Sequence, residues 1–294
     1  MLSAMKRTIL TIIFLAVSLS AFSANQQFVY TQIAQNKGLT STVNCIYKEK
    51  DGDVWIGTPN GLYRFNGYSL DHYEEQLHGS RQIFHISMDR NEALWVLTDR
   101  HVLRRDAGSD TFRKISDTVS DFYCMAYGDD CIWIGADHSL YRYAEGTMKL
   151  HMSLPAPYDC RFIEVLDGGT LLCCSQEGKI IVNQNRYETI SSTFGEATEV
   201  SATLTDSQGR IWIGLYNKGI EVYDKEGRKL KSYNTGNSSL SCDIVLCLAE
   251  KDSTILVGTD GGGVNIINPE SDSIRVLSHI SGDATSFPAS SIKS

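Results

Sequence analysis

Short apolar stretches alternate with polar ones along most of the chain, and turn-forming residues separate them at brief intervals. In the first clear unit the alternation predicts four strands, at about 42–48, 53–58, 61–65 and 68–73. Asp-Gly or Asn-Gly pairs such as Asp51-Gly52 lie between them, and these residues tolerate the positive φ that tight hairpin turns require. Because no helical apolar stripe follows residue 23, we expect an all-β domain.

The unit is repeated, and its most distinctive position is held by tryptophan. The segment Asp51–Thr58 recurs along the chain, and all four tryptophans occupy the same slot in it, while leucine holds the slot in two weaker copies. The slot positions are Trp55, Trp95, Trp133, Leu172, Trp212 and Leu256. Four antiparallel strands every 38 to 44 residues predict a β-propeller of four-stranded antiparallel blades, with six blades visible plus a truncated seventh. We expect Trp55, Trp95, Trp133 and Trp212 to form the structural core of the repeat, between adjacent blades.

The first 23 residues predict a signal peptide. Lys6 and Arg7 precede an apolar run from Ile9 to Leu19, and small residues favour cleavage after Ser23. The alternative is an uncleaved membrane anchor, although the run is shorter than the roughly 20 residues that a spanning helix needs. The propeller is expected over 24–294.

Both ends of that region bear on how the ring closes. Residues 28–32 resemble an isolated fourth strand that could close the ring, and six repeats follow over about 40–280. Residues 285–294 match the lead-in to another first strand, so we expect an incomplete next blade and a longer parent polypeptide. The alternative is a six-bladed ring with a redundant first strand.

The charge and the cysteine positions limit the kinds of binding site that the chain can form. The formal net charge of −8 argues against nucleic-acid binding through a basic surface. Among the eight cysteines, Cys45, Cys124 and Cys247 precede the slot by nine or ten residues, which predicts small core residues. A bond between Cys124 and Cys131 across a hairpin is a less favoured alternative. The cysteine and histidine spacings are not typical of zinc sites, so we expect neither a metal nor a cofactor.

The chain lacks the motifs of common hydrolases and nucleotide-binding proteins, and the Gly-rich run Asp260–Gly263 has no following helix to bind phosphate. A ligand site is more plausible on loops held by a rigid scaffold. The candidate ligand-binding residues are Asn60, Arg81, Arg100, His138, Tyr158, Tyr216, Asn217 and Asp260. Aromatic, charged and amide groups together suit a sugar or uronic acid, whereas the alternative is ordinary polar turn residues.

Residues 51–65 (D-G-D-V-W-I-G-T-P-N-G-L-Y-R-F) and the lead-in 38–44 resemble the regulator-propeller repeat. Such repeats form the periplasmic sensor region of hybrid two-component systems in gut Bacteroidetes. Leu97 in place of the repeat glycine and Leu172 in place of tryptophan depart from the pattern. The resemblance implies an N-terminal, non-catalytic, periplasmic sensor fragment that responds to carbohydrate. The full-length relative would be a histidine kinase anchored in the inner membrane.

The resemblance also implies partners. It suggests an oligosaccharide ligand and a homodimer through the propeller of the full-length protein. It implies no nucleic-acid contact by this part, and membrane attachment only through a downstream segment. Two other functions stay open: a propeller enzyme acting on polysaccharide, as a lyase or hydrolase, and a passive protein-interaction scaffold.

Overall fold

The computed structural model describes residues 38–39, 41–115, 121–128, 130–156, 158–166, 170–175, 178–183, 186–189, 199–283 and 286–293. The chain divides into two compact units, Met1–Gln32 and Ile33–Ser294, and every described residue belongs to the second. The predicted signal peptide, 1–23, and closing strand, 28–32, lie outside the described residues. Within the described part, no helix is both long enough and apolar enough to cross a membrane.

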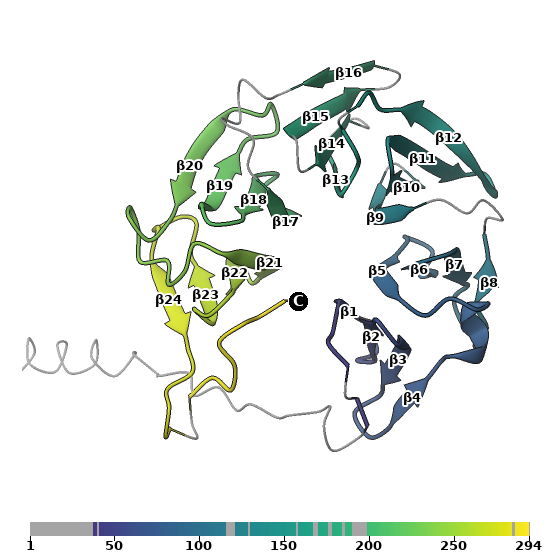
Figure 1. Ribbon diagram of the computed structural model, residues 1–294, viewed down its shortest axis with the longest axis horizontal. Coiled ribbons are helices and arrows are strands. Elements are labelled where there is room, and N and C mark those ends of the chain that lie inside the picture. The colour runs from purple at the N-terminus through teal and green to yellow at the C-terminus, as the bar shows by residue number, and fades with distance from the viewer. Residues whose placement is uncertain are drawn as a thin grey trace, which may run out of the picture. The chain divides into compact units, whose positions relative to one another are not determined.

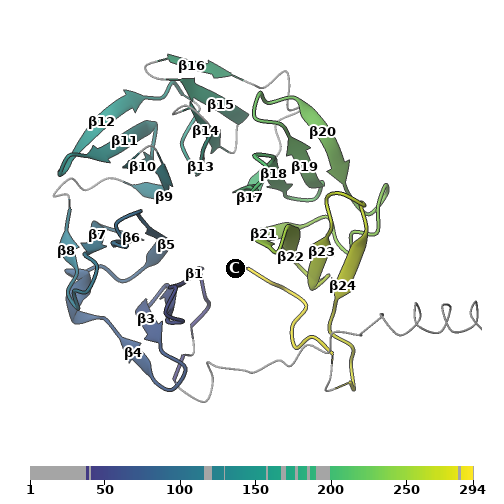
Figure 2. The same cartoon turned by 180° about the vertical axis from the view of Figure 1, so that it is seen from behind.

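The described strands form six four-stranded sheets, which we number as blades in chain order (Figures 1 and 2). Blades 1 to 3 contain β1 Cys45–Lys48, β2 Val54–Thr58, β3 Gly61–Phe65, β4 Leu70–His72; β5 Ile83–Met88, β6 Leu94–Thr98, β7 Val102–Arg105, β8 Arg113–Lys114; and β9 Phe122–Gly128, β10 Cys131–Ala136, β11 Ser139–Ala144, β12 Thr147–Ser153. Blades 4 to 6 contain β13 Phe162–Val165, β14 Thr170–Ser175, β15 Gly178–Asn183, β16 Arg186–Thr189; β17 Val200–Thr205, β18 Ile211–Leu215, β19 Gly219–Tyr223, β20 Lys229–Tyr233; and β21 Val245–Lys251, β22 Thr254–Thr259, β23 Val264–Ile267, β24 Ile274–Leu277.

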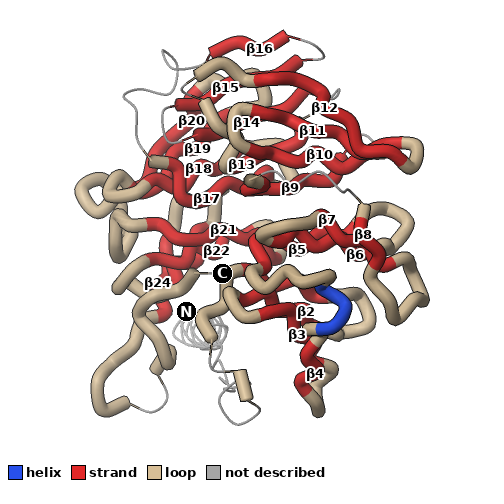
Figure 3. Tube along the Cα trace, turned by 45° about the vertical axis from the view of Figure 1, so that its right-hand side comes forward, coloured by secondary structure: helices blue, strands red, loops and turns tan. Residues whose placement is uncertain are grey.

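Each sheet is an antiparallel meander of strands in chain order, which confirms the predicted four-stranded antiparallel blades. Blade 2 has the shortest outer strand among the described blades, since β8 has only two residues. The first strand of each blade lies innermost, and consecutive inner strands contact one another (Figure 1). Strands dominate the described residues, and the one helical element among them is a single 3-10 turn, η2, at Glu75–Leu77 (Figure 3).

Turn chemistry explains the register of the first hairpin in blades 1 to 3. In blade 1, Gly52 takes a φ of 106°, which is a conformation that favours glycine. Glu92 and Asp130 fill the equivalent turn of blades 2 and 3 with φ near 59°. The turn therefore requires a residue with positive φ. Glycine adopts such a φ without steric strain, so the Asp-Gly pair of the first repeat suits this turn best.

Every tryptophan lies in the second strand of its blade and packs against the next blade. None of the four is more than 6% exposed. Trp55 clusters with Ile83 and Leu94 of blade 2, and Trp212 clusters with Val245 and Ile255 of blade 6. The repeat places one large apolar side chain at each of these contacts, where burial stabilises the fold by roughly 25 cal/mol per Å² of apolar surface.

A carboxylate six residues before the tryptophan accepts the indole N–H in three blades. These bonds join Trp55 to Glu49 (2.9 Å), Trp95 to Asp89 (3.0 Å) and Trp212 to Asp206 (2.8 Å). Blade 3 has Tyr127 at that position, and Trp133 Nε1 is buried there without a hydrogen-bond partner. The interaction therefore occurs in three of the four blades that carry the tryptophan and is missing from blade 3.

The residues near 290 lie along the inner edge of blade 6. Ile292 N donates to the carbonyl at the end of β22 (3.0 Å), and Ile292 Cβ lies 2.9 Å from the point where a side chain on Gly258 would begin. Cys160, which leads into blade 4, has the same relation to Gly135 of blade 3. Residues predicted to lead into a further first strand thus occupy the position of a lead-in, although 286–293 contain only an isolated bridge.

Replacing Trp212 with Phe should destabilise the protein more than replacing Trp133 with Phe. Trp212→Phe removes the donor from the Asp206 carboxylate, whose side chain is fully buried, whereas Trp133→Phe removes an indole N–H that has no partner. Arg210 Nε still donates to the Asp206 carboxylate in that variant (2.7 Å), so only one of its hydrogen bonds is lost. Since a hydrogen bond to a charged group contributes roughly 1.5–3 kcal/mol, Trp212→Phe should cost about 1 kcal/mol more than Trp133→Phe. Urea unfolding of both variants measures the difference, and equal losses would contradict the role of the carboxylate.

Candidate functional site

A cavity of about 650 Å³ lies among the inner strands and is the largest of the described cavities. Side chains from the inner strands of all six blades line it, together with Ile292 and Lys293. Ligand pockets in proteins are commonly concave and of similar volume, with a few polar groups set among apolar ones. This cavity is therefore the candidate functional site.

An arginine stacked on a tyrosine is the most distinctive feature of the cavity. The guanidinium carbon of Arg161 lies 3.7 Å from the centroid of the Tyr123 ring, a cation–π contact between blades 3 and 4. Arg161 Nε also donates to the Asp159 carboxylate. These two contacts fix the plane of the guanidinium, whose side chain is still 38% exposed, so its remaining N–H groups can bind a ligand.

A carboxylate stands on the inner strand of blade 4, three residues beyond Arg161. Glu164 accepts hydrogen bonds from Thr203 (2.7 Å) and Thr205 (2.9 Å), both of which belong to blade 5. Removal from water raises the pKa of Glu164, and the hydrogen bonds from the two threonines offset part of that rise. Arg161 and Glu164 therefore join blade 4 to its neighbours on either side.

Two further polar groups line the cavity. Burial lowers the pKa of His85 to about 4, so its imidazole is neutral near pH 7. Ser201 Oγ is buried without a hydrogen-bond partner. The cavity thus offers a fixed cation, one carboxylate, a neutral imidazole and a hydroxyl, set among apolar residues such as Phe84 and Phe162. This mixture can hold a polyhydroxylated molecule by hydrogen bonds and by contact with its C–H faces.

The eight loop residues predicted from the sequence lie apart from this cavity. They follow the second strand of a blade or precede the first strand, and backbone bonds such as Asp99 N to Gln82 O (3.0 Å) join these two kinds of loop. Seven are exposed, and Tyr158 is half-buried. They are Asn60, Arg81, Arg100, His138, Tyr158, Tyr216, Asn217 and Asp260, and none of them lines the cavity.

Some of the eight are brought together in pairs. His138 Nδ1 lies 2.8 Å from the carbonyl oxygen of Tyr158, three residues before Arg161. Arg81 and Arg100 both contact Asp99, the former through its backbone N–H (3.0 Å) and the latter through Nε at 3.9 Å. The others bond to neighbouring loops: Asn60 donates to Ser41 Oγ (2.7 Å), and the Asp260 carboxylate accepts the hydroxyl of Ser291. Tyr216 and Asn217 lie beside each other in the loop of blade 5.

A group of carboxylates lies outside the cavity, at the turn between β1 and β2. One oxygen each from Glu49, Asp51 and Asp53 falls within 4.8 Å of the others. Glu49 already accepts from Trp55 and pairs with Arg105, while Asp53 pairs with Arg64. The charges of Glu49 and Asp53 are therefore matched by arginines, and the pair of Glu49 with Arg105 joins blade 1 to blade 2.

Sequence reasoning missed the cavity residues, although one signal marked two of them. Arg161 and Glu164 place charges in and beside an inner strand, where the other repeats are mostly apolar. A charged side chain at such a position must face either water or a partner, so it points to an open cavity. Tyr123 and His85 carry no comparable signal, because aromatic residues are common in strands.

Residues 37–60 match the family described as two component regulator propeller, which confirms the resemblance inferred from the repeat. No curated protein matches the chain. The fold is similar to crystal structures of the extracellular domain of BT4673 from B. thetaiotaomicron, which is described as a putative one component system and as a putative hybrid two component system. Identity is 23% and 21%, the TM-score is 0.71 for both, and the match covers 91% and 90% of this chain.

The chain spans only 37% and 36% of those two structures. A second kind of neighbour is a lyase: catalytically inactive virginiamycin B lyase from Staphylococcus aureus, with quinupristin. It is 12% identical, with a TM-score of 0.66, and the match covers 83% of this chain and 86% of the lyase. At such identities these structures share the fold with this chain.

The half-buried His85 of the cavity should make stability depend on pH. In the unfolded chain histidine titrates near pH 6.5, whereas the folded pKa of His85 is about 4. A lowered pKa contributes stability above pH 6.5 that is lost as the pH falls towards 4. His85→Asn should therefore lose less stability than the wild type between pH 6.5 and 4 in chemical denaturation, with His138→Asn at an exposed loop as the control. Parallel losses in His85→Asn and the wild type would contradict the assignment.

Proposed function

We propose that this chain is the ligand-sensing propeller of an exported two-component signalling protein, and that it responds to carbohydrate without catalysing a reaction. The observation that carries the proposal is a regulator-propeller repeat at residues 37–60 in a domain whose inner strands enclose a polar and aromatic cavity. The extracellular origin of the BT4673 domain supports an exported, periplasmic location.

The chemistry of the cavity supports carbohydrate as the ligand. A sugar presents hydroxyl groups around its rim and C–H groups on its faces. The Arg161 guanidinium can donate to two neighbouring oxygens, and the Glu164 carboxylate can accept from hydroxyl groups. The stack of Arg161 on Tyr123 orients the donor before a ligand arrives, which lowers the entropy lost on binding.

Contacts between blades give such a ligand a route to signalling. Arg161 connects blade 4 to blade 3 through Tyr123, and Glu164 connects blade 4 to blade 5 through Thr203. A ligand bound to either group changes a contact between blades and so favours one packing arrangement over another. In a longer protein, dimer contacts made by the propeller would respond to that change.

The eight exposed loop residues are proposed as a second, outer part of the same recognition surface. His138 and Tyr158 lie beside the segment that carries Arg161, so they are the members best placed to contact a long oligosaccharide. The remaining six extend around the same end of the blades.

A propeller lyase is the second candidate, and the fold similarity to virginiamycin B lyase favours it over a passive scaffold. The cavity holds a neutral imidazole and a carboxylate of raised pKa, which are groups that can accept or donate a proton. A polysaccharide panel separates the two functions, because a lyase or hydrolase would release unsaturated products or new reducing ends. We expect neither product.

Binding should depend on the stacked arginine. A panel of plant and host oligosaccharides is screened by thermal shift with the wild type, Arg161→Met and Arg228→Met. Arg228 is a matched control because it pairs with Asp224 in an outer turn of blade 5. A ligand at about 100 times its Kd stabilises the folded state by roughly 2.7 kcal/mol, which raises Tm by several degrees. We expect that rise in the wild type and Arg228→Met and its loss in Arg161→Met. A full response in Arg161→Met would overturn the proposed site.

A further inference from the structure

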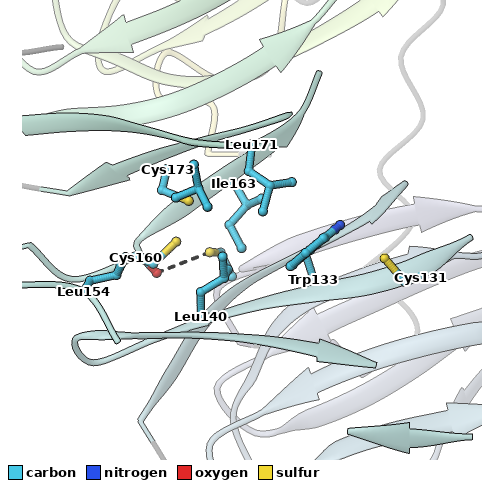
Figure 4. Close-up of a cluster of buried hydrophobic side chains, with 10 residues drawn as sticks. Cys131, Trp133, Leu140, Leu154, Cys160, Ile163, Leu171 and Cys173 are labelled. Atoms are coloured by element: carbon cyan, nitrogen blue, oxygen red, sulfur yellow. Dashed lines mark hydrogen bonds between the residues drawn. The ribbon is translucent and has the colours of Figure 1, made fainter. Parts of the chain in front are cut away.

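Two cysteine sulfurs occupy the same small space where blade 3 meets blade 4. Cys124 lies on β9, and Cys160 lies in the segment that leads into β13. A Cβ placed on Gly135 would meet Cys124 Sγ at 2.5 Å and Cys160 Sγ at 2.8 Å, so both sulfurs lie within 3 Å of one point. The Cys124 thiol also donates to the Cys160 carbonyl oxygen at 3.3 Å, the bond drawn as a dashed line in Figure 4.

Equivalent positions in other blades show that this proximity is built into the repeat. Over the matching glycine, an inner-strand residue meets a residue that begins the next inner strand or immediately precedes it. The pairs are Cys45 with Ile83 over Gly57, Ala202 with Val245 over Gly214, and Cys247 with Ile292 over Gly258. Only the pair over Gly135 consists of two cysteines among these four contacts.

Other thiols are less well placed. Cys131 pairs with Gly128 across the hairpin while Cys124 pairs with Gly135, so Cys124 and Cys131 are not cross-strand neighbours. Cys173 lies in the same buried cluster as Cys160 (Figure 4), but it is on β14 of blade 4 itself. A bond from Cys160 to Cys173 would link two parts of one blade, whereas a bond to Cys124 links two blades.

We propose that Cys124 and Cys160 form a disulfide that joins blade 3 to blade 4. The two thiols give up two protons and two electrons as the S–S bond forms. A disulfide-bearing oxidant accepts the electrons and is reduced to two thiols. In the cell this step requires an oxidising compartment, so it rests on the proposed export of the chain.

The bond would also position the candidate site. Tyr123 directly precedes Cys124, and Arg161 directly follows Cys160. The disulfide would therefore hold together the two backbone segments that carry the stacked guanidinium and phenol ring. A cation–π contact across a blade boundary is strengthened when the segments on both sides have little freedom to separate.

Burial determines when the bond forms. Cys160 is fully buried and Cys124 is 6% exposed. Burial raises the pKa of Cys160 well above its usual range, and the nearby thiols of Cys124 and Cys173 add to the rise. Because the thiolate is the reactive form, the folded, reduced protein should oxidise slowly. The disulfide should form while the chain folds and then resist reductants until the protein unfolds.

Disulfide mapping tests the pairing without any substitution. The full chain is exported to a bacterial periplasm and, separately, refolded from denaturant in a glutathione redox buffer. Free thiols are alkylated under denaturing conditions and peptides are identified by mass spectrometry. A peptide that links Cys124 to Cys160 in both samples supports the proposal. Free thiols at both positions, or a bond from Cys160 to Cys173, would overturn it. The linked peptide in the refolded sample alone would uphold the pairing and count against the proposed location.

Serine variants give a second readout. Cys124→Ser and Cys160→Ser are compared with Cys247→Ser, which changes the equivalent inner-strand position where the neighbour is Ile292. A disulfide that closes a loop of this length should raise Tm by about 5–10 °C. With reductant present during unfolding, we therefore expect Tm to fall by that amount in the wild type and in Cys247→Ser. Cys124→Ser and Cys160→Ser lack the disulfide, so reductant should not lower their Tm further. A wild-type Tm that is the same with and without reductant present throughout unfolding would contradict the disulfide.

Discussion

The contact between the indole of one blade and the face of the next is the interaction on which this domain depends. Each sheet is too small to bury its own apolar face, so it is stable only when a neighbour covers it. The tryptophan supplies a large apolar side chain at a fixed depth in the second strand. The carboxylate six residues earlier fixes the ring through its N–H in blades 1, 2 and 5. Stacking of like sheets follows from that repeated contact.

Close approach of the inner strands follows from a second constraint. Two residues after the tryptophan, glycine leaves room for a side chain of the same blade and one from the start of the next inner strand, as at Gly57 and Gly214. Blade 2 has Leu97 at this position, and that side chain packs with Phe122 of blade 3 instead. The inner strands therefore enclose a central cavity. Polar side chains, which would be unfavourable in the apolar contacts between blades, can line it.

Much of the fold could be predicted from the sequence because the signals are local. The turn pairs, the alternation and the tryptophan period each act over a few residues, and they define strands such as β2 and β3 closely. The carboxylate partner of the tryptophan was also within reach, since Glu49, Asp89 and Asp206 share one spacing. It was missed because acidic residues near turns are common and usually solvated.

The candidate site was harder to predict because it depends on contacts between repeats. Arg161 meets Tyr123 across 38 positions of sequence, and neither residue belongs to the repeat motif. The loop residues chosen from the sequence do lie at one end of the blades, but the cavity is formed by inner-strand side chains. The meeting of Cys124 and Cys160 has the same origin, since it needs the geometry of two adjacent blades.

Hydrogen–deuterium exchange with a bound saccharide tests the central claim most directly, because it separates the cavity from the outer loops. With the saccharide that raises Tm the most, we expect slower exchange in peptides that cover β9 and β13, whose backbone carries or adjoins Tyr123 and Arg161. Protection confined to the loops that contain Arg100 and Tyr216, with unchanged exchange in the inner strands, would contradict a ligand site in the cavity.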